Sequence, residues 1–138
     1  MPSNRIAVGT MIKLLHVQPG ERAVDLGSGD GRIVIALAAA GVEAHGYEHN
    51  PLLVWYSRLR IHQAGLSKRA FIHHGDFWKA GLSRYTIVTL FGISYVMKAL
   101  EEKFSRECRS GSRVASYVFR LPTRTPALHE RGVYLYQY

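Results

Sequence analysis

The sequence predicts an α/β fold: a Rossmann-like, doubly wound, mostly parallel sheet of about six strands, with the last strand antiparallel. Short apolar segments alternate along the chain with longer amphipathic ones. Hydrophobic residues make up 47% of the 138 residues, enough to bury a core, and no apolar run is long enough to span a membrane. The length suits one domain covering residues 1–138.

The first half of the chain predicts three helices and two strands. We expect helices over residues 5–16 and 32–40, and strands over 22–26 and 42–48. Asn50 followed by Pro51 is typical of a helix start, with a capping side chain before a proline at the first helical position. That third helix is expected to end near Gly65 and to carry one apolar stripe, formed by Leu52, Trp55, Tyr56 and Leu59.

The second half predicts four more strands, over residues 70–76, 85–91, 113–119 and 133–138. The helix between the second and third of these has the clearest period. Its inward face is expected to hold Ile93, Met97, Leu100 and Phe104, and its outward face Glu101, Glu102, Lys103 and Arg106.

Strands separated by helices favour parallel pairing with right-handed crossovers. The connection before the last strand contains Pro122 and Pro126 and is too broken for a crossover helix. We therefore expect the last strand to lie antiparallel beside the fifth, as an edge or near-edge strand on which Tyr134, Tyr136 and Tyr138 alternate.

Charge and cysteine content limit the partners and the compartment. Eighteen Lys and Arg against ten Asp and Glu give a net charge of +8, which favours an anionic partner, although the charge is scattered along the sequence. Cys108 is the single cysteine, so no internal disulfide forms, and we expect a cytoplasmic protein. The histidines predict no metal site: His73 and His74 point to opposite faces of a strand, and His45 lacks carboxylate partners at ligand spacing.

A glycine-rich loop, residues 27–31, joins the first strand to the second helix. In a doubly wound sheet, ligands bind at the carboxyl ends of the strands near the switch in strand order, which is the position of this loop. Its three glycines let a ligand approach the main chain closely. Glu48 ends the second strand, where an acidic side chain can bind both hydroxyls of a ribose. We expect Glu48 to serve the ribose without supporting the core.

Two ligand classes fit such a loop, a dinucleotide and S-adenosylmethionine. The third glycine of a dinucleotide fingerprint is replaced by Arg32, and Asp25 and Asp30 bracket the loop. Two carboxylates there would repel a phosphate and attract the ammonium and sulfonium groups of S-adenosylmethionine. That cofactor is therefore expected to contact Asp25, Gly27, Ser28, Gly29, Asp30, Glu48, His49, Asp76 and Phe77.

Asp76 follows the third strand and can accept a hydrogen bond from an adenine amino group, while an apolar neighbour covers the ring. A helix cap is the alternative role for Asp76. Phe91, Gly92 and Tyr95, after the fourth strand, are the candidates to line the methyl-acceptor pocket.

Residues 25–31, Asp-Leu-Gly-Ser-Gly-Asp-Gly, are similar to the first motif of class I methyltransferases. More narrowly, the chain resembles the small lysine methyltransferases that modify the mitochondrial ADP/ATP carrier and the ATP-synthase c-subunit, and their archaeal relatives. The matching segments are VDLGSGDGRIVIALA, GYEHNPLLVWYSRLR, GDFWKAGLSRYTIVTLFGISYVMKALEEKF and RVASYVF with a following proline, which together reach from about Pro19 to Pro126. The resemblance implies a protein-lysine N-methyltransferase that acts on a neutral lysine amine.

Two departures from that family count against a membrane-embedded substrate. Eukaryotic members carry an N-terminal membrane-targeting segment, whereas this sequence starts almost at the core. Thr123 and Arg124 also stand where an aromatic residue is expected after Leu121-Pro122.

Other functions remain open. The basic composition supports an RNA methyltransferase, which predicts arginines gathered around the cofactor mouth. Residues 91–94 lack the Asn/Asp-Pro-Pro-aromatic sequence of adenine and related amino-nitrogen methyltransferases, and Cys108 is not placed as a cytosine-attacking nucleophile. A small-molecule acceptor and a non-catalytic cofactor-binding module are the further alternatives.

Overall fold

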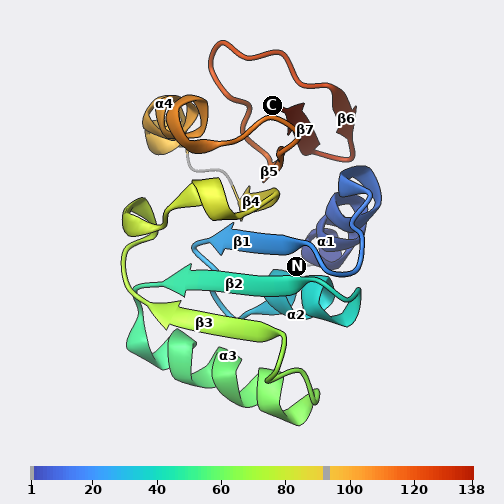
Figure 1. Cartoon of the computed structure of the whole chain (residues 1–138), viewed down its shortest axis with the longest axis vertical. Coiled ribbons are helices and arrows are strands. Elements are labelled where there is room, and N and C mark those ends of the chain that lie inside the picture. Colours follow the sequence, from blue (N-terminus) through green and yellow to red (C-terminus); the bar gives the residue numbers. More distant parts are fainter. Residues whose placement is uncertain (1, 92–93) are drawn as a thin grey trace.

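The computed structural model describes residues 2–91 and 94–138 and contains a seven-stranded sheet (Figure 1). The strands are β1 (Arg22–Leu26), β2 (Glu43–Glu48), β3 (Ala70–His74), β4 (Ile87–Phe91), β5 (Arg113–Tyr117), β6 (Leu128–Glu130) and β7 (Val133–Gln137). Their order is β3-β2-β1-β4-β5-β7-β6, with the first five strands parallel and β7 antiparallel to β5. The predicted Rossmann-like class and the antiparallel last strand are confirmed.

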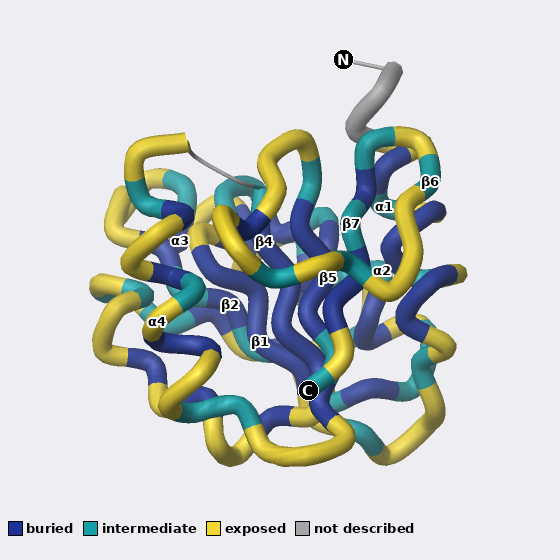
Figure 2. The backbone as a smooth tube through the Cα atoms, turned by 90° about the horizontal axis from the view of Figure 1, so that it is seen from above, coloured by how far each residue is buried: buried dark blue, intermediate teal, exposed yellow. Residues whose placement is uncertain are grey.

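Helices cover the two faces of the sheet unequally. The helices are α1 (Pro2–Leu15), α2 (Arg32–Ala39), α3 (Pro51–Gln63) and α4 (Met97–Glu107), with short 3₁₀ turns η1 (Phe77–Lys79), η2 (Leu82–Arg84) and η3 (Ser94–Val96). The first three helices share one hydrophobic core with the sheet, and α4 packs in a second core on the other face. The central strands are buried while the outer turns are exposed (Figure 2).

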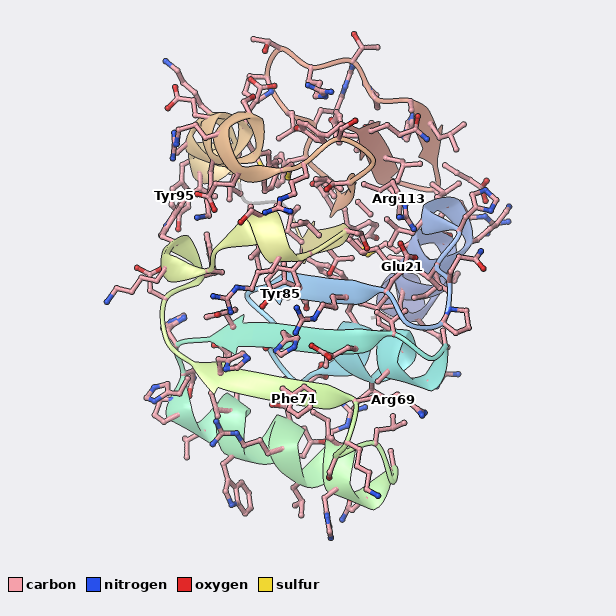
Figure 3. The ribbon with its side chains drawn as sticks, in the orientation of Figure 1. Glu21, Arg69, Phe71, Tyr85, Tyr95 and Arg113 are labelled. Carbon is pink, nitrogen blue, oxygen red and sulfur yellow. The ribbon has the colours of Figure 1, made fainter. Side chains whose placement is uncertain are left out.

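An ion pair fastens the end of α1 to the sheet. The Arg113 guanidinium lies 2.7 Å from the Glu21 carboxylate and also donates to the carbonyl of Leu15 (Figure 3). The hydrogen bond from Arg113 lowers the pKa of Glu21 to about 2. The carboxylate therefore stays charged at neutral pH and holds three segments together.

The C-terminal part differs from expectation in two ways. A seventh strand, β6, pairs antiparallel with β7 through a turn in which Arg131 and Gly132 both have positive φ, of 50° and 83°. Strand β5 ends at Tyr117 instead of Phe119 because Val118 takes a φ of 81°. That backbone conformation is strained for a β-branched residue and turns the chain out of the sheet.

Helix α4 presents Met97, Leu100 and Phe104 inward as predicted, while Ile93 lies outside the described residues. Lys103 was predicted to face outward, and this is wrong. Its side chain is buried, and its ammonium donates to the Trp78 carbonyl at 3.0 Å and the Glu107 carboxylate at 2.9 Å. An aliphatic stem can be buried when its charged end finds such partners.

Helix α3 begins as predicted, with the Asn50 side chain accepting a hydrogen bond from Leu52 N at 3.0 Å. Its inner side, however, consists of Val54, Ser57 and Ile61. The predicted apolar stripe lies on the opposite side of the helix and is exposed. Helix periodicity locates two apolar sides here but does not say which one packs on the sheet.

The loop before α2 lies directly on β2 and α3. A Cβ atom on Gly46 would stand 2.5 Å from Ser28 Cβ and 2.9 Å from the Val34 side chain. A Cβ atom on Gly31, whose φ is 84°, would stand 2.9 Å from Ser57 Cβ. Both glycines are therefore required by close approach, and Gly46 is a requirement that sequence analysis missed.

We expect Gly46→Ala to lower the free energy of unfolding by about 1–3 kcal/mol, because the added methyl group overpacks the contact with Ser28. Gly81→Ala is the matched control, since a Cβ atom there would have nothing within 4 Å and the φ of Gly81 is −81°. Urea denaturation of both variants makes the measurement. Equal free energies of unfolding for the two variants would contradict the prediction, because they would show that the loop moves to make room for the methyl group at no cost.

Candidate functional site

Three cavities meet at Gly27, at the carboxyl ends of the central strands. Their volumes are about 540, 300 and 220 Å³, and the two larger ones are within the size range of small-molecule sites. The largest is lined by Gly27, Tyr47, Glu48, His49, Gly75, Asp76 and Phe77. The second is apolar, lined by Leu26, Gly27, Phe77, Leu90, Phe91, Val96 and Leu100. The third is lined by Asp25, Gly27, Ser28, Gly29, Asp30, Arg32, Ile33 and Phe91.

Backbone hydrogen bonds fix the loop that separates these cavities. The amides of Gly27 and Ser28 both donate to the carbonyl of Tyr47, at 3.0 and 2.9 Å. Gly27, Gly29 and Gly31 have φ values of 78°, 56° and 84°, which residues with side chains rarely adopt. The loop is thus pinned to the end of β2, and its outer surface is main chain accessible to a ligand.

Glu48 links the loop to α3. Its carboxylate accepts hydrogen bonds from Gly29 N at 2.8 Å and Asn50 N at 3.0 Å, and the side chain is buried. Glu48 was expected to serve the ribose without supporting the core, and its hydrogen bonds show that it also holds the loop and the start of α3. A carboxylate has about four acceptor positions, so two remain for hydroxyl groups in the cavity. His49 lies beside it with its imidazole largely exposed.

Asp25 is fully buried at the end of β1, where Thr89 donates a hydrogen bond to it at 2.8 Å. Burial raises the pKa of Asp25 to about 7, and the nearby Glu48 and Asp30 carboxylates also raise it. The Thr89 hydroxyl opposes this effect. At neutral pH this carboxyl group is close to half protonated, and a cation in the adjoining cavity would favour its charged form.

Asp30 was expected to attract the cationic groups of the cofactor together with Asp25, but its carboxylate is paired with arginines. Arg32 donates to the Asp30 carboxylate at 2.6 Å, and the Arg60 guanidinium lies 3.4 Å from it. Hydrogen bonding from Arg32 lowers the pKa of Asp30. The charge of Asp30 is thus matched by two arginines, which leaves Asp25, Glu48 and Asp76 as the acidic lining residues without an arginine partner in the described residues.

The structure places Asp76 and Phe77 on the wall of the largest cavity, and Phe77 also lines the apolar one. Asp76 additionally caps η1, accepting a hydrogen bond from Trp78 N at 2.9 Å. The two roles considered for Asp76 are compatible, because its second carboxylate oxygen is not used in the cap.

The acceptor residues are divided by the structure. Phe91 lines two of the cavities. Tyr95 is 83% exposed, lines none of the three, and lies at the periphery beside α4 (Figure 3). Gly92 lies outside the described residues. Val96 and Leu100 complete the apolar wall and were missed as site residues, since the helical period signals burial but not which residues border a cavity.

An unsatisfied polar atom lies at the site. The hydroxyl of Ser28 is buried and has no hydrogen-bond partner in the described residues. Buried polar atoms are nearly always hydrogen-bonded, so a polar ligand in the adjoining cavity fits this atom. Together with the acceptor capacity of Glu48 and the acidic Asp25, the residues present fit the predicted S-adenosylmethionine.

The histidines form contacts that sequence analysis missed. His45 Nδ1 lies 2.8 Å from His73 Nε2, and His45 Nε2 lies 2.8 Å from the Glu43 carboxylate. Sequence analysis did not identify Glu43 as a hydrogen-bond partner of His45. Within residues 2–91 and 94–138, no group of three or more ligating side chains is arranged to hold a metal ion.

A family comparison covers most of the described site. Residues 25–128 match the model of the ANTKMT methyltransferase domain family. The chain belongs to this family. The match extends from Asp25 at the end of β1 to the start of β6 and so includes all three cavities.

Individual relatives agree. The chain is 43% identical over 126 residues to the ATP synthase c-subunit lysine N-methyltransferase of Rattus norvegicus, covering 91% of this chain but 58% of that protein. It is 32% identical over 123 residues to a protein-lysine N-methyltransferase of Saccharolobus islandicus, covering 88% and 76%. The chain thus spans little more than half the length of the rat relative.

Among solved structures, an RNA methyltransferase from Salinibacter ruber in complex with S-adenosyl-L-homocysteine superimposes with a TM-score of 0.89. It is 31% identical, and the match covers 96% of this chain and 90% of that one.

Among the described residues, no helix is long and apolar enough to cross a bilayer.

We expect Asp25→Asn to stabilise the ligand-free protein at pH 8. The pKa of Asp25 is raised from 3.8 to about 7, so the folded state binds its proton more tightly than the unfolded state. Stability is therefore greatest below about pH 4 and decreases as the pH rises to about 7. The neutral, isosteric asparagine removes that loss, on the order of a few kcal/mol.

Asp30→Asn is the contrasting control. Its carboxylate has a lowered pKa, so its loss should reduce stability at pH 8. Chemical denaturation at pH 4 and pH 8 measures both variants. An Asp25→Asn protein less stable than wild type at pH 8 would contradict the assignment of a destabilising buried charge.

Proposed function

We propose that this protein transfers a methyl group from S-adenosylmethionine to the side-chain amine of a lysine in a protein substrate. The observation that carries the proposal is the group of cavities around Gly27, where the acidic Asp25 and Glu48 lie beside an apolar cavity. Membership of the methyltransferase family and the names of the rat and archaeal relatives support the same function.

Two of the three cavities each suit one part of the cofactor. The spare acceptor positions of Glu48 suit the two ribose hydroxyls, and Asp76 with Phe77 suits the adenine ring in the same cavity. On the other side of Gly27, the buried Asp25 carboxylate suits the ammonium group of the cofactor's methionine part. The Ser28 hydroxyl can donate a hydrogen bond to the carboxylate of that same part of the cofactor. The bound cofactor supplies a methyl group already activated by its sulfonium.

The apolar cavity suits the acceptor. Its lining, which includes Phe77, Leu90 and Phe91, contains no charged group. A lysine amine entering the cavity would therefore lose water and favour its neutral form. The new carbon–nitrogen bond forms as the carbon–sulfur bond breaks, and the proton shed by the amine passes to solvent. The protein thus contributes alignment and desolvation, and no strong general base is required.

RNA methylation is a second candidate, because the Salinibacter ruber neighbour carries that name. The walls of the three cavities support it less. Arg32 is the only Lys or Arg among their described lining residues, and it is paired with Asp30. The predicted cytoplasmic location and the single-domain organisation stay predictions.

The two acceptors are separated by one labelling experiment. Cell extract is incubated with the protein and methyl-labelled S-adenosylmethionine, then treated with protease or ribonuclease. We expect label that is sensitive to protease, resistant to ribonuclease, and recovered as methyl-lysine after acid hydrolysis. Asp25→Ala and Glu48→Ala proteins provide the background. Label that is removed by ribonuclease would show that the acceptor is RNA. Cofactor binding without any labelled product would indicate a non-catalytic module.

Cofactor binding should tighten as the pH rises from 6 to 8. A ligand ammonium favours the charged form of Asp25, so a proton must leave when binding occurs below its pKa of about 7. One pH unit below that value, affinity should be weaker by about ten-fold. Calorimetry with S-adenosylhomocysteine measures this, and Asp25→Asn should flatten the profile. A wild-type profile as flat as that of the variant would contradict the role of Asp25.

A further inference from the structure

The outer side of α3 exposes an apolar stripe to solvent. We define this stripe as Leu52, Trp55, Tyr56 and Leu59, whose exposed fractions are 76%, 65%, 46% and 39%. The residues lie one helical turn apart, so they form one continuous strip. A surface helix normally presents polar residues to water, and an exposed apolar patch marks an interaction site.

The chain around this stripe is uniformly basic. Residues 49–75 contain four Lys or Arg, four of the seven histidines, and no Asp or Glu, so they contribute half of the net charge of +8. Arg58 beside the stripe donates to the neutral carbonyl of Ile72 and keeps its full charge. Arg60 shares Asp30 with Arg32, which leaves one positive charge in excess there.

We propose that the outer side of α3 docks on the surface of an anionic lipid bilayer. Trp, Tyr and Leu flanked by arginines are the residues with which an amphipathic helix enters the headgroup region. Arginine stems can extend along the apolar surface while their guanidinium groups reach lipid phosphates. Helix α3 lies beside the edge strand β3 at one end of the molecule, so a planar surface can approach its outer side (Figure 1).

Charge and chemistry argue against two other occupants. A second copy of this chain would bring two basic surfaces together across the stripe, with repulsion between them. A nucleic acid would match the charge, but Leu52 and Leu59 offer it neither hydrogen bonds nor stacking surfaces. A lipid surface uses both the apolar and the basic residues.

Docking through α3 leaves the cavities accessible. Helix α3 starts three residues after Glu48, and its stripe faces away from the sheet, whereas the cavities open at the carboxyl ends of the strands. Docking would therefore hold the site next to the membrane surface without covering it. This inference does not depend on which acceptor is methylated.

The test is flotation of the full chain with vesicles of phosphatidylcholine, with or without phosphatidylglycerol. We expect binding to the anionic vesicles that weakens with salt, and weak binding to the neutral ones. Trp55→Ser and the double variant Leu52→Ser/Leu59→Ser should each reduce the vesicle-bound fraction about ten-fold or more. Leu128→Ser is the matched control, since Leu128 is 46% exposed on β6 at the opposite edge of the sheet.

Calorimetry with S-adenosylhomocysteine checks that the variants are folded. We expect their affinity for this ligand to be unchanged, so a loss of vesicle binding would concern the stripe and not the proposed methyltransferase site. Variants that float like wild type would overturn the proposal, as would failure of the wild type to bind anionic vesicles. A dimer abolished by the same variants without lipid binding would assign the stripe to a second copy. Binding of RNA that the same variants weaken, with no vesicle binding, would assign it to nucleic acid.

Discussion

The contact between the glycine loop and β2 is the constraint on which the rest of the site depends. Ser28 lies so close to Gly46 that no side chain fits between them, and the two amides before Gly29 are held by the Tyr47 carbonyl. Any larger residue at position 46 would lift the loop from the sheet. Because Gly27 borders all three cavities, moving the loop would change all of them together. The geometry of the site therefore follows from one close approach of the glycine loop to the main chain of β2.

That packing has an electrostatic consequence. With the loop packed on β2, Asp25 is buried away from water and lies near Glu48 and Asp30. Both effects raise the pKa of Asp25 toward neutrality. The pKa of Asp30 is lowered instead, because Arg32 on α2 and Arg60 on α3 both contact its carboxylate. The folded protein thus retains one carboxyl group that is unfavourable in its charged form until a cation approaches. Such stored instability is typical of binding sites rather than of stable cores.

Much of this could be predicted from sequence, because it depends on neighbours in the chain. Strand β1, the glycine loop and the Asn50 cap are local patterns, and strand–helix alternation fixes the parallel pairing. Features that depend on distant contacts could not be predicted. The requirement for Gly46 comes from Ser28, and the second arginine beside Asp30, Arg60, lies on another helix. Strand β6 forms because β7 offers it an edge, although three residues carry little signal of their own.

Helix α3 shows how the site determines the surface. Its inner side contacts the loop through Ser57, where a Cβ atom on Gly31 would already stand at 2.9 Å. Rotating the helix to bury the stripe would bring a much larger side chain, such as Trp55, to that position, and the loop has no space for it. A small residue is therefore required at position 57, and the large apolar residues of the stripe remain outside. Since the fold gains nothing from exposing them, a partner that covers the stripe gives these residues a role that packing cannot.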